Sequence, residues 1–238
     1  MGVLQESGLV VLPGVFDGLG ASIARHVGCR AIYASGGAIA RSFGLPDLGL
    51  ISLNEMGQRL ESIVRAFEGP VIADGDTGYG DVQHVRRMVQ TFESAGISGL
   101  HIEDQSFPKR CGHLDGKSLI QSDQMCRKIE AATKARQDSS FLIIGRTDAI
   151  AIEGYEAAIT RGQAMVDAGA DVVFIEAPET MGQIEDIPGR FSVPVLINMF
   201  PDGKTPYVRP EQLAKFGYRF VIVPSDVQRA CIRATEQV

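Results

Sequence analysis

Short runs of apolar, often β-branched residues alternate along the chain with stretches in which apolar residues recur every three or four positions. The runs have the length of buried strands, and the stretches have the period of helices with one buried face. The predicted strands are 10–16, 31–35, 71–73, 99–103, 141–145, 172–176, 195–198 and 220–223. The predicted helices are 19–27, 53–67, 82–95, 123–137, 155–168 and 210–216. Regular alternation of this kind predicts parallel strands covered by helices.

Eight strand–helix units in 238 residues favour a closed (β/α)₈ TIM barrel over an open doubly wound sheet. Polar residues also follow nearly every predicted strand, and only a barrel brings all of those strand ends to one face. We therefore expect one α/β barrel domain over residues 1–238. Because the chain stops soon after the eighth strand, we expect the C-terminal helical segment to be truncated or missing.

The composition excludes several classes of protein. With 45% hydrophobic and 22% charged residues the chain is expected to fold, and its formal charge of −6 attracts neither nucleic acid nor an anionic membrane. No apolar run approaches the roughly 20 residues of a membrane span, and no signal peptide is evident. The four cysteines lack CxxC pairs, which argues against disulfides or structural zinc. We expect a cytoplasmic protein, with organellar import left open.

Three acidic residues lie at the ends of two consecutive predicted strands. Asp74 and Asp76 follow one strand, and Glu103 ends the next. Carboxylates meeting at one barrel mouth would repel each other, whereas Mg²⁺, or Mn²⁺ in its place, binds such oxygen ligands together with water. The alternative is that each residue caps a loop or helix. The three together favour a metal site.

A second candidate lies in the loop after the fourth predicted strand. Lys109, Arg110 and His113 surround Cys111, and Gly112 and Gly116 give the loop backbone freedom. Neighbouring cations stabilise a thiolate, and glycines are common where loops close over a site. The alternative, from these residues alone, is a solvated basic loop with an incidental cysteine.

Six segments together resemble the isocitrate lyase/phosphoenolpyruvate mutase superfamily, in order and over nearly the whole chain. They are SGG at 35–37, LPDLG at 45–49, DGDTGYG at 74–80, GLHIEDQ at 99–105, KRCGH at 109–113 and GRTDA at 145–149. The KRCGH segment is similar to that of the carbon–carbon lyase and hydrolase branches. Two features depart from the family: Gly75 replaces the usual alanine, and the C-terminal helices that family members exchange between subunits are expected to be truncated or missing.

The resemblance implies a (β/α)₈ barrel and assigns binding roles. Its metal ligands, binding Mg²⁺ directly or through water, would be Asp74, Asp76 and Glu103. The substrate carboxylates would be bound by Arg146 and by the backbone of Ser35, Gly36 and Gly37. Glu176 and Asn198, at the ends of later predicted strands, fit hydrogen bonding to the substrate or transition state.

The resemblance also implies proton transfer by Cys111, as the general acid on a gating loop, with His113 orienting the loop or the substrate. Two residues are candidates for the base that takes the hydroxyl proton, Asp47 and Tyr33. Each has a structural alternative, because a tyrosine is common in a strand and an aspartate is common in a loop rich in proline and glycine.

The implied activity is Mg²⁺-dependent cleavage of a 2-hydroxy di- or tricarboxylate, of the 2-alkylmalate or 2-methylisocitrate type, to a 2-oxoacid and a carboxylate. Oxaloacetate acetylhydrolase or decarboxylase activity is an alternative, and a dicarboxylate-binding barrel without lyase activity is an alternative of another class. Segments 175–178, 198–199 and 203–206 look closer to the alkylmalate lyase and hydrolase branches than to methylisocitrate lyase. The resemblance further implies a homo-oligomer, most simply a homotetramer.

Overall fold

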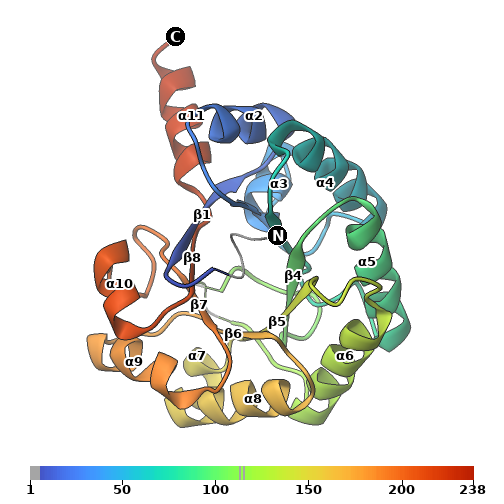
Figure 1. Cartoon of the computed structure of the whole chain (residues 1–238), viewed down its shortest axis with the longest axis vertical. Helices are drawn as coiled ribbons and strands as arrows, with labels where there is room; N and C mark the ends of the chain where they lie inside the picture. The colour runs from blue at the N-terminus through green and yellow to red at the C-terminus, as the bar shows by residue number, and fades with distance from the viewer. Residues whose placement is uncertain (1–5, 113, 115) are drawn as a thin grey trace.

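The computed structural model describes residues 6–112, 114 and 116–238 and contains a closed barrel of parallel strands in sequence order (Figure 1). The strands are β1 Val10–Val15, β2 Ile32–Ala34, β3 Val71–Asp74, β4 Gly99–Glu103, β5 Leu142–Thr147, β6 Val172–Ile175, β7 Val195–Asn198 and β8 Phe220–Val223. The ring closes where β1 pairs in parallel with β8. The predicted TIM barrel is confirmed, and each predicted strand end lies within two residues of the observed one.

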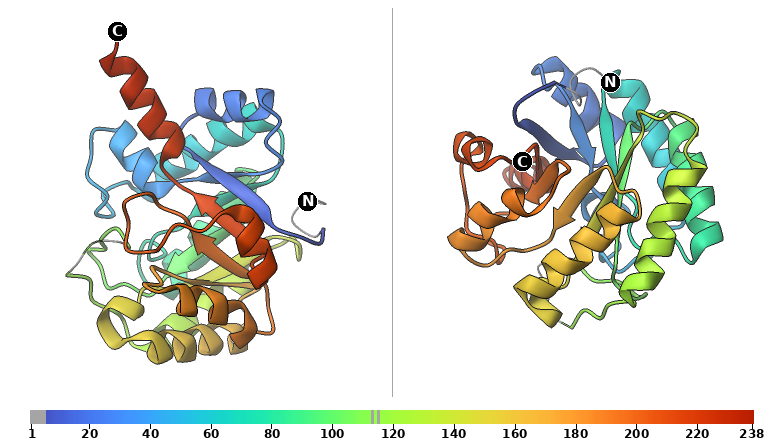
Figure 2. Two further views of the ribbon diagram at one scale, coloured as in Figure 1. Left: turned by 90° about the vertical axis from the view of Figure 1, so that its left-hand side faces the viewer. Right: turned by 60° about the horizontal axis from the view of Figure 1, so that its bottom comes forward.

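The helices form a ring outside the barrel, and α11 projects past it beside α2 (Figures 1 and 2). They are α2 Gly18–His26, α3 Gly36–Ser42, α4 Leu53–Phe67, α5 Val82–Ser94, α6 Ser122–Ala135, α7 Ile150–Glu153, α8 Tyr155–Asp167, α9 Met181–Asp186, α10 Pro210–Phe216 and α11 Asp226–Glu236, with a 3₁₀ turn at Ile187–Arg190. In the part of the chain that the structure describes, no helix has both the length and the apolar composition needed to cross a bilayer.

Local signals explain several helix ends. Ser52 caps α4 by accepting a hydrogen bond from the Glu55 backbone N–H, and the Glu55 side chain accepts one from the Ser52 N–H in return. Gly96, Gly169 and Gly217 follow α5, α8 and α10 with φ of +88°, +101° and +100°. Side chains rarely adopt this left-handed backbone, so glycine ends these helices at little cost.

The core has two layers. An outer layer lies between strands and helices, and an inner layer fills the barrel with side chains such as Leu12, Ile72 and Phe174. His101 of β4 is fully buried in this inner layer, with its ring against those of Tyr33 and Phe174. The packed interior leaves the carboxyl ends of the strands as the place where polar groups meet.

Candidate active site

A small chamber lies at the carboxyl ends of the strands. Nine of the predicted site residues line it: Tyr33, Ser35, Gly37, Asp47, Asp74, Cys111, Arg146, Glu176 and Asn198. Its volume is about 70 Å³, which admits only a few water molecules at roughly 10–15 Å³ each. Gly36, Asp76 and Glu103 contact residues of this lining. His113 lies outside the described residues.

Asp74 is the best-anchored of the three predicted metal ligands. Its Oδ1 accepts a hydrogen bond of 2.9 Å from the Asp76 N–H, and its Oδ2 accepts one of 3.1 Å from Tyr33 Oη. Burial opposes its ionisation, but the surrounding basic side chains, His101 first, hold the pKa of Asp74 below its usual range. The side chain is therefore a fixed carboxylate facing the chamber.

Asp76 and Glu103 complete the acidic group with different surroundings. Lys109 Nζ lies 2.6 Å from Asp76 Oδ1. Even so, burial raises the pKa of Asp76 to about 6, and Asp74 adds to the effect. Glu103 Oε2 lies 3.3 Å from Arg146 Nη1, whereas Oε1 is buried with no hydrogen-bond partner among the described residues. A cation bound nearby would therefore stabilise the charged form of both carboxyls.

These donors fit a hydrated divalent cation better than a fully dehydrated one. Within residues 6–112, 114 and 116–238, no three histidine, cysteine or acidic side chains gather closely enough to bind one ion together. Mg²⁺ commonly keeps several waters and uses one or two carboxylates directly. Such an ion would be held by Asp74, with Asp76 and Glu103 close enough to contribute directly or through water.

Tyr33 is well placed to donate a hydrogen bond and poorly suited to act as a base. Its hydroxyl is buried, donates to Asp74, and lies 2.8 Å from His101 Nε2. Burial, together with the charge of Asp74, raises the pKa of Tyr33 well above its ordinary value. Of the two candidate bases this leaves Asp47 as the better fit, and Asp47 is held in an ion pair by Lys109.

The SGG segment forms a tight turn into α3 against the acidic side chains. Ser35 is the N-cap of this short helix. A Cβ on Gly36 would lie 2.6 Å from Asp74 Oδ2, and a Cβ on Gly37 would lie 2.8 Å from Asp47 Oδ2. Only glycine allows the backbone so close to both carboxylates. The structure thus brings the predicted carboxylate-binding backbone next to the predicted metal ligand.

Gly36→Ala should therefore lower kcat/KM by about 100-fold, the loss expected when reacting groups shift by about 1 Å. Asp74 has little room to yield, because Tyr33 and the Asp76 N–H hold it. Gly189→Ala is the matched control, since its Cβ would meet no atom within 4 Å. Steady-state kinetics of both variants check this, and equal kcat/KM values would contradict it.

Arg146 of β5 is fixed by a buried network. Its Nε and Nη2 donate to the two carboxylate oxygens of Asp148 at 2.9 and 3.1 Å, and its guanidinium stacks over the Phe174 ring. Glu176 lies near its other edge, where it accepts a hydrogen bond of 3.2 Å from Asn198 Nδ2. A paired, oriented guanidinium of this kind suits a substrate carboxylate.

Several residues in the site were not among the predicted site residues. Lys109 contacts two of the acidic groups, Gln105 binds the backbone of Arg110, and Asp148 orients Arg146. Lys117 joins Asp148 to the loop backbone at Gly112. Lys109 and Asp148 stand inside the matching motifs, whereas nothing in the sequence pattern distinguishes Lys117 from a surface lysine.

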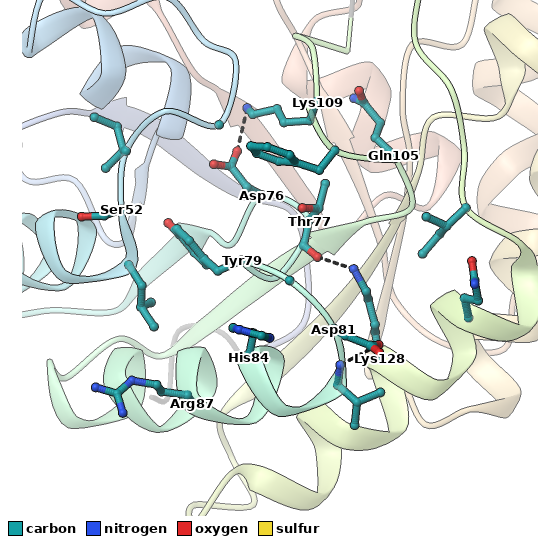
Figure 3. A pocket seen from close by; sticks show the side chains of 18 of the residues that line it. Ser52, Asp76, Thr77, Tyr79, Asp81, His84, Arg87, Gln105, Lys109 and Lys128 are labelled. Atoms are coloured by element: carbon teal, nitrogen blue, oxygen red, sulfur yellow. Dashed lines mark hydrogen bonds and ion pairs between the residues drawn. The ribbon is translucent and has the colours of Figure 1, made fainter.

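A larger cavity of about 810 Å³ lies beside the chamber, between α5, α6 and the loop before α4 (Figure 3). Lys109 lines both spaces, whereas Asp76 lines the larger one, and Figure 3 shows the ion pair between these two residues. Cys111, Arg146 and the SGG segment do not line the larger cavity. The predicted chemistry therefore belongs to the smaller chamber.

Comparison with known proteins establishes the family. The family model described as phosphoenolpyruvate phosphomutase matches residues 2–238. The 2-methylisocitrate lyase of Aeropyrum pernix is 43% identical over 99% of this chain and 76% of its own length. A crystal structure of 2,3-dimethylmalate lyase, described as a PEP mutase/isocitrate lyase superfamily member, superimposes with a TM-score of 0.95 at 36% identity, covering 99% of this chain and 80% of that one. The chain belongs to this superfamily.

Two further structures bear on the chemistry. Oxaloacetate acetylhydrolase matches with a TM-score of 0.92 at 36% identity, over 99% of this chain and 81% of that one. Phosphonopyruvate hydrolase, in complex with oxalate and Mg²⁺, matches with a TM-score of 0.88 at 30% identity, over 100% and 83%. The predicted superfamily and the prediction of a carbon–carbon lyase are confirmed. The comparisons do not choose between the methylisocitrate lyase and alkylmalate lyase branches. The relative with 43% identity is a 2-methylisocitrate lyase, and the structure with a TM-score of 0.95 is a 2,3-dimethylmalate lyase.

Proposed function

We propose that the protein cleaves a 2-hydroxy di- or tricarboxylate of the 2-methylisocitrate or 2-alkylmalate type into a 2-oxoacid and a second carboxylate. One observation carries this proposal: the chamber places the carboxylate of Asp74, the guanidinium of Arg146 and the thiol of Cys111 around a single small volume. Cleavage next to a carboxylate needs three functions together: a ligand for the cation that neutralises developing charge, a group that binds the substrate carboxylate, and a proton donor.

In the proposed reaction, Arg146 and the backbone at Gly36 and Gly37 bind the substrate carboxylate. Asp47 takes the proton of the 2-hydroxyl, the adjacent carbon–carbon bond breaks, and the 2-oxoacid carbonyl forms. The electron pair of that bond stays on the departing carbon, beside its carboxylate, and Cys111 protonates it. Mg²⁺ bound at Asp74 would supply Lewis-acid stabilisation of the developing carbonyl.

The remaining predicted residues would support these steps. Glu176 and the Asn198 amide lie beside Arg146, where they would hydrogen-bond the substrate and exclude misplaced waters. Tyr33 would hold Asp74 in place. His113 is expected to orient the loop or the substrate.

A substrate panel tests the proposal. Purified protein in Mg²⁺ is mixed with 2-methylisocitrate, 2,3-dimethylmalate, isocitrate or oxaloacetate, and pyruvate, glyoxylate, oxalate and CO₂ are measured. Pyruvate from either of the first two supports the proposed function. Oxalate from oxaloacetate would favour the second candidate, an acetylhydrolase, which is motivated by the TM-score of 0.92. CO₂ alone would indicate a decarboxylase, and silence throughout would favour a dicarboxylate-binding barrel.

Removal of divalent metal should abolish turnover. Without a cation, Asp74, Asp76 and Glu103 would repel a substrate that carries two or three negative charges. Activity should disappear after treatment with EDTA and buffer exchange, and added Mg²⁺ or Mn²⁺ should restore it. Full turnover in the chelated, exchanged sample would remove the metal from the proposal.

We also propose that the protein assembles as a homo-oligomer, most simply a tetramer. Leu19, Ile23 and Val27 follow one another at intervals of four along α2 and its end, and are 71%, 51% and 67% exposed. A contiguous apolar stripe of this kind commonly marks an interface. Light scattering should give a multiple of the 25.6 kDa chain mass. A particle of one chain at micromolar concentration would contradict the proposal.

A further inference from the structure

The loop that carries Cys111 is fastened to the chamber wall on both sides of the thiol. On one side, the Arg110 N–H donates to Gln105 Oε1 and Gln105 Nε2 donates to the Arg110 carbonyl, both at 2.8 Å. On the other side, the Gly112 carbonyl accepts a hydrogen bond from Lys117 Nζ. Both neighbours of Cys111 are therefore held in place, one through Gln105 and the other through Lys117.

Gly112 lies directly on the substrate-binding groups. A Cβ at this position would lie 2.4 Å from Glu176 Oε1 and 2.5 Å from Arg146 Nη2. Any larger residue would lift the loop from its seat. Because the chamber beneath measures only about 70 Å³, a substrate of the proposed size can enter only when this part of the loop moves away.

Lys117 ties this seat to Arg146 through one shared carboxylate. Its side chain is 1% exposed, and its Nζ lies 3.1 Å from Oδ1 of Asp148, which is fully buried. The same carboxylate receives both hydrogen bonds from Arg146. A buried ammonium is costly unless its donors are satisfied, and lifting the loop takes one acceptor, the Gly112 carbonyl, away from it.

We propose that Lys117 is a positioning residue that latches the Cys111 loop in its closed state. When the loop closes, the Gly112 carbonyl satisfies the Lys117 ammonium, and the Lys117–Asp148–Arg146 chain makes loop closure and orientation of Arg146 one event. Cys111 then faces the chamber only while Arg146 is aligned. The catalytic consequence rests on the proposed function, whereas the latch itself does not.

Alkylation of Cys111 measures the latch without turnover. The protein is treated with iodoacetamide, and modification of Cys111 is followed by peptide mass spectrometry against Cys126 of α6 as the internal reference. In Lys117→Met the relative rate at Cys111 should rise by roughly tenfold or more, since a hydrogen bond to a charged group corresponds to about 10–100-fold in an equilibrium constant. The matched control is Lys128→Met, which removes another buried ammonium, one that donates to the Thr77 carbonyl.

A second variant keeps the test decisive should Lys117→Met fail to fold. Gly112→Ala retains Lys117 and Asp148 but blocks the seat, so it should raise Cys111 alkylation in the same way. On the substrate identified by the panel, both variants should lower kcat/KM by roughly tenfold or more, with Lys128→Met near the wild-type value. Faster alkylation without any wild-type lyase activity would overturn the proposed function and leave the latch standing. Wild-type alkylation ratios in the folded variants would overturn the latch.

Discussion

Replacing Cys111 with serine should lower kcat by roughly 10²–10⁴, the usual contribution of a positioned general acid. Serine keeps the size and hydrogen bonding of the thiol, but its hydroxyl releases a proton far less readily than a thiol does. The residue lines the chamber with Arg146 and Asp74, but a thiol is not among the oxygen ligands that Mg²⁺ prefers. Mg²⁺ affinity and substrate binding should therefore change little, so that the loss falls on kcat.

Cys126→Ser provides the matched control. Cys126 is also half-buried, and its Sγ donates to the Ala164 carbonyl on α8, outside the chamber lining. Its kcat should stay near the wild-type value. If Cys111→Ser turned over its substrate as fast as Cys126→Ser, another group would deliver the proton, and Cys111 would serve only to shape the loop.

The sequence predicts the parts of the fold that depend on local signals, such as helix caps and helix-ending glycines. Ser52 with Glu55 marks the start of α4, and Gly96, Gly169 and Gly217 mark helix ends where the backbone turns left-handed. The alternation of strands and helices then favours a barrel. The short helices α3, α7 and α9 are not predicted, because four to seven residues are too few to show a helical period. The equally short α10 is predicted because Pro210 marks its start and Gly217 its end.

The tertiary contacts decide what sequence reasoning left open at the site. Whether Tyr33 is a base or a packed aromatic depends on Asp74, which lies 41 positions away in the sequence. Burial and the charge of Asp74 raise the pKa of the phenol, and its hydroxyl donates a hydrogen bond to Asp74, so Tyr33 is neither a base nor only a packed aromatic. Similarly, the sequence predicts that Lys109 is a cation beside the Cys111 thiol, whereas in the structure its ammonium pairs with Asp47 and Asp76.

The neighbouring carboxylates explain where the charge of Lys109 lies. Burial opposes the charge on the side chain, but the carboxylates, Asp76 first, raise the pKa of Lys109 well above its usual value. The ammonium is thus committed to the acidic side of the chamber. No spacing rule predicts this, because Asp47, Asp76 and Lys109 come from three loops that only the closed barrel brings together.

Asp74→Asn should lower activity at least as strongly as Cys111→Ser does. Asparagine preserves the volume next to Gly36 and can still accept a hydrogen bond from the Asp76 N–H. Of the three predicted metal ligands, it removes the one whose pKa is held low, and so the strongest anionic ligand for a cation. Metal catalysis contributes several kcal/mol, and each 1.4 kcal/mol is about tenfold in rate, so kcat/KM should fall by roughly 10³ or more.

Asp171→Asn separates the metal role from the loss of an ion-paired carboxylate elsewhere in the barrel. Asp171 precedes β6 at the opposite end of the barrel and pairs with Arg136, so its loss affects stability without reaching the chamber. Titration calorimetry with Mg²⁺ should show weaker binding for Asp74→Asn and unchanged binding for Asp171→Asn. Unchanged Mg²⁺ affinity in Asp74→Asn would move the metal to other ligands. If Asp74→Asn lost its affinity for Mg²⁺ but kept its turnover, the cation would not be needed for cleavage. The charge of Arg146 would then be sufficient to hold the substrate.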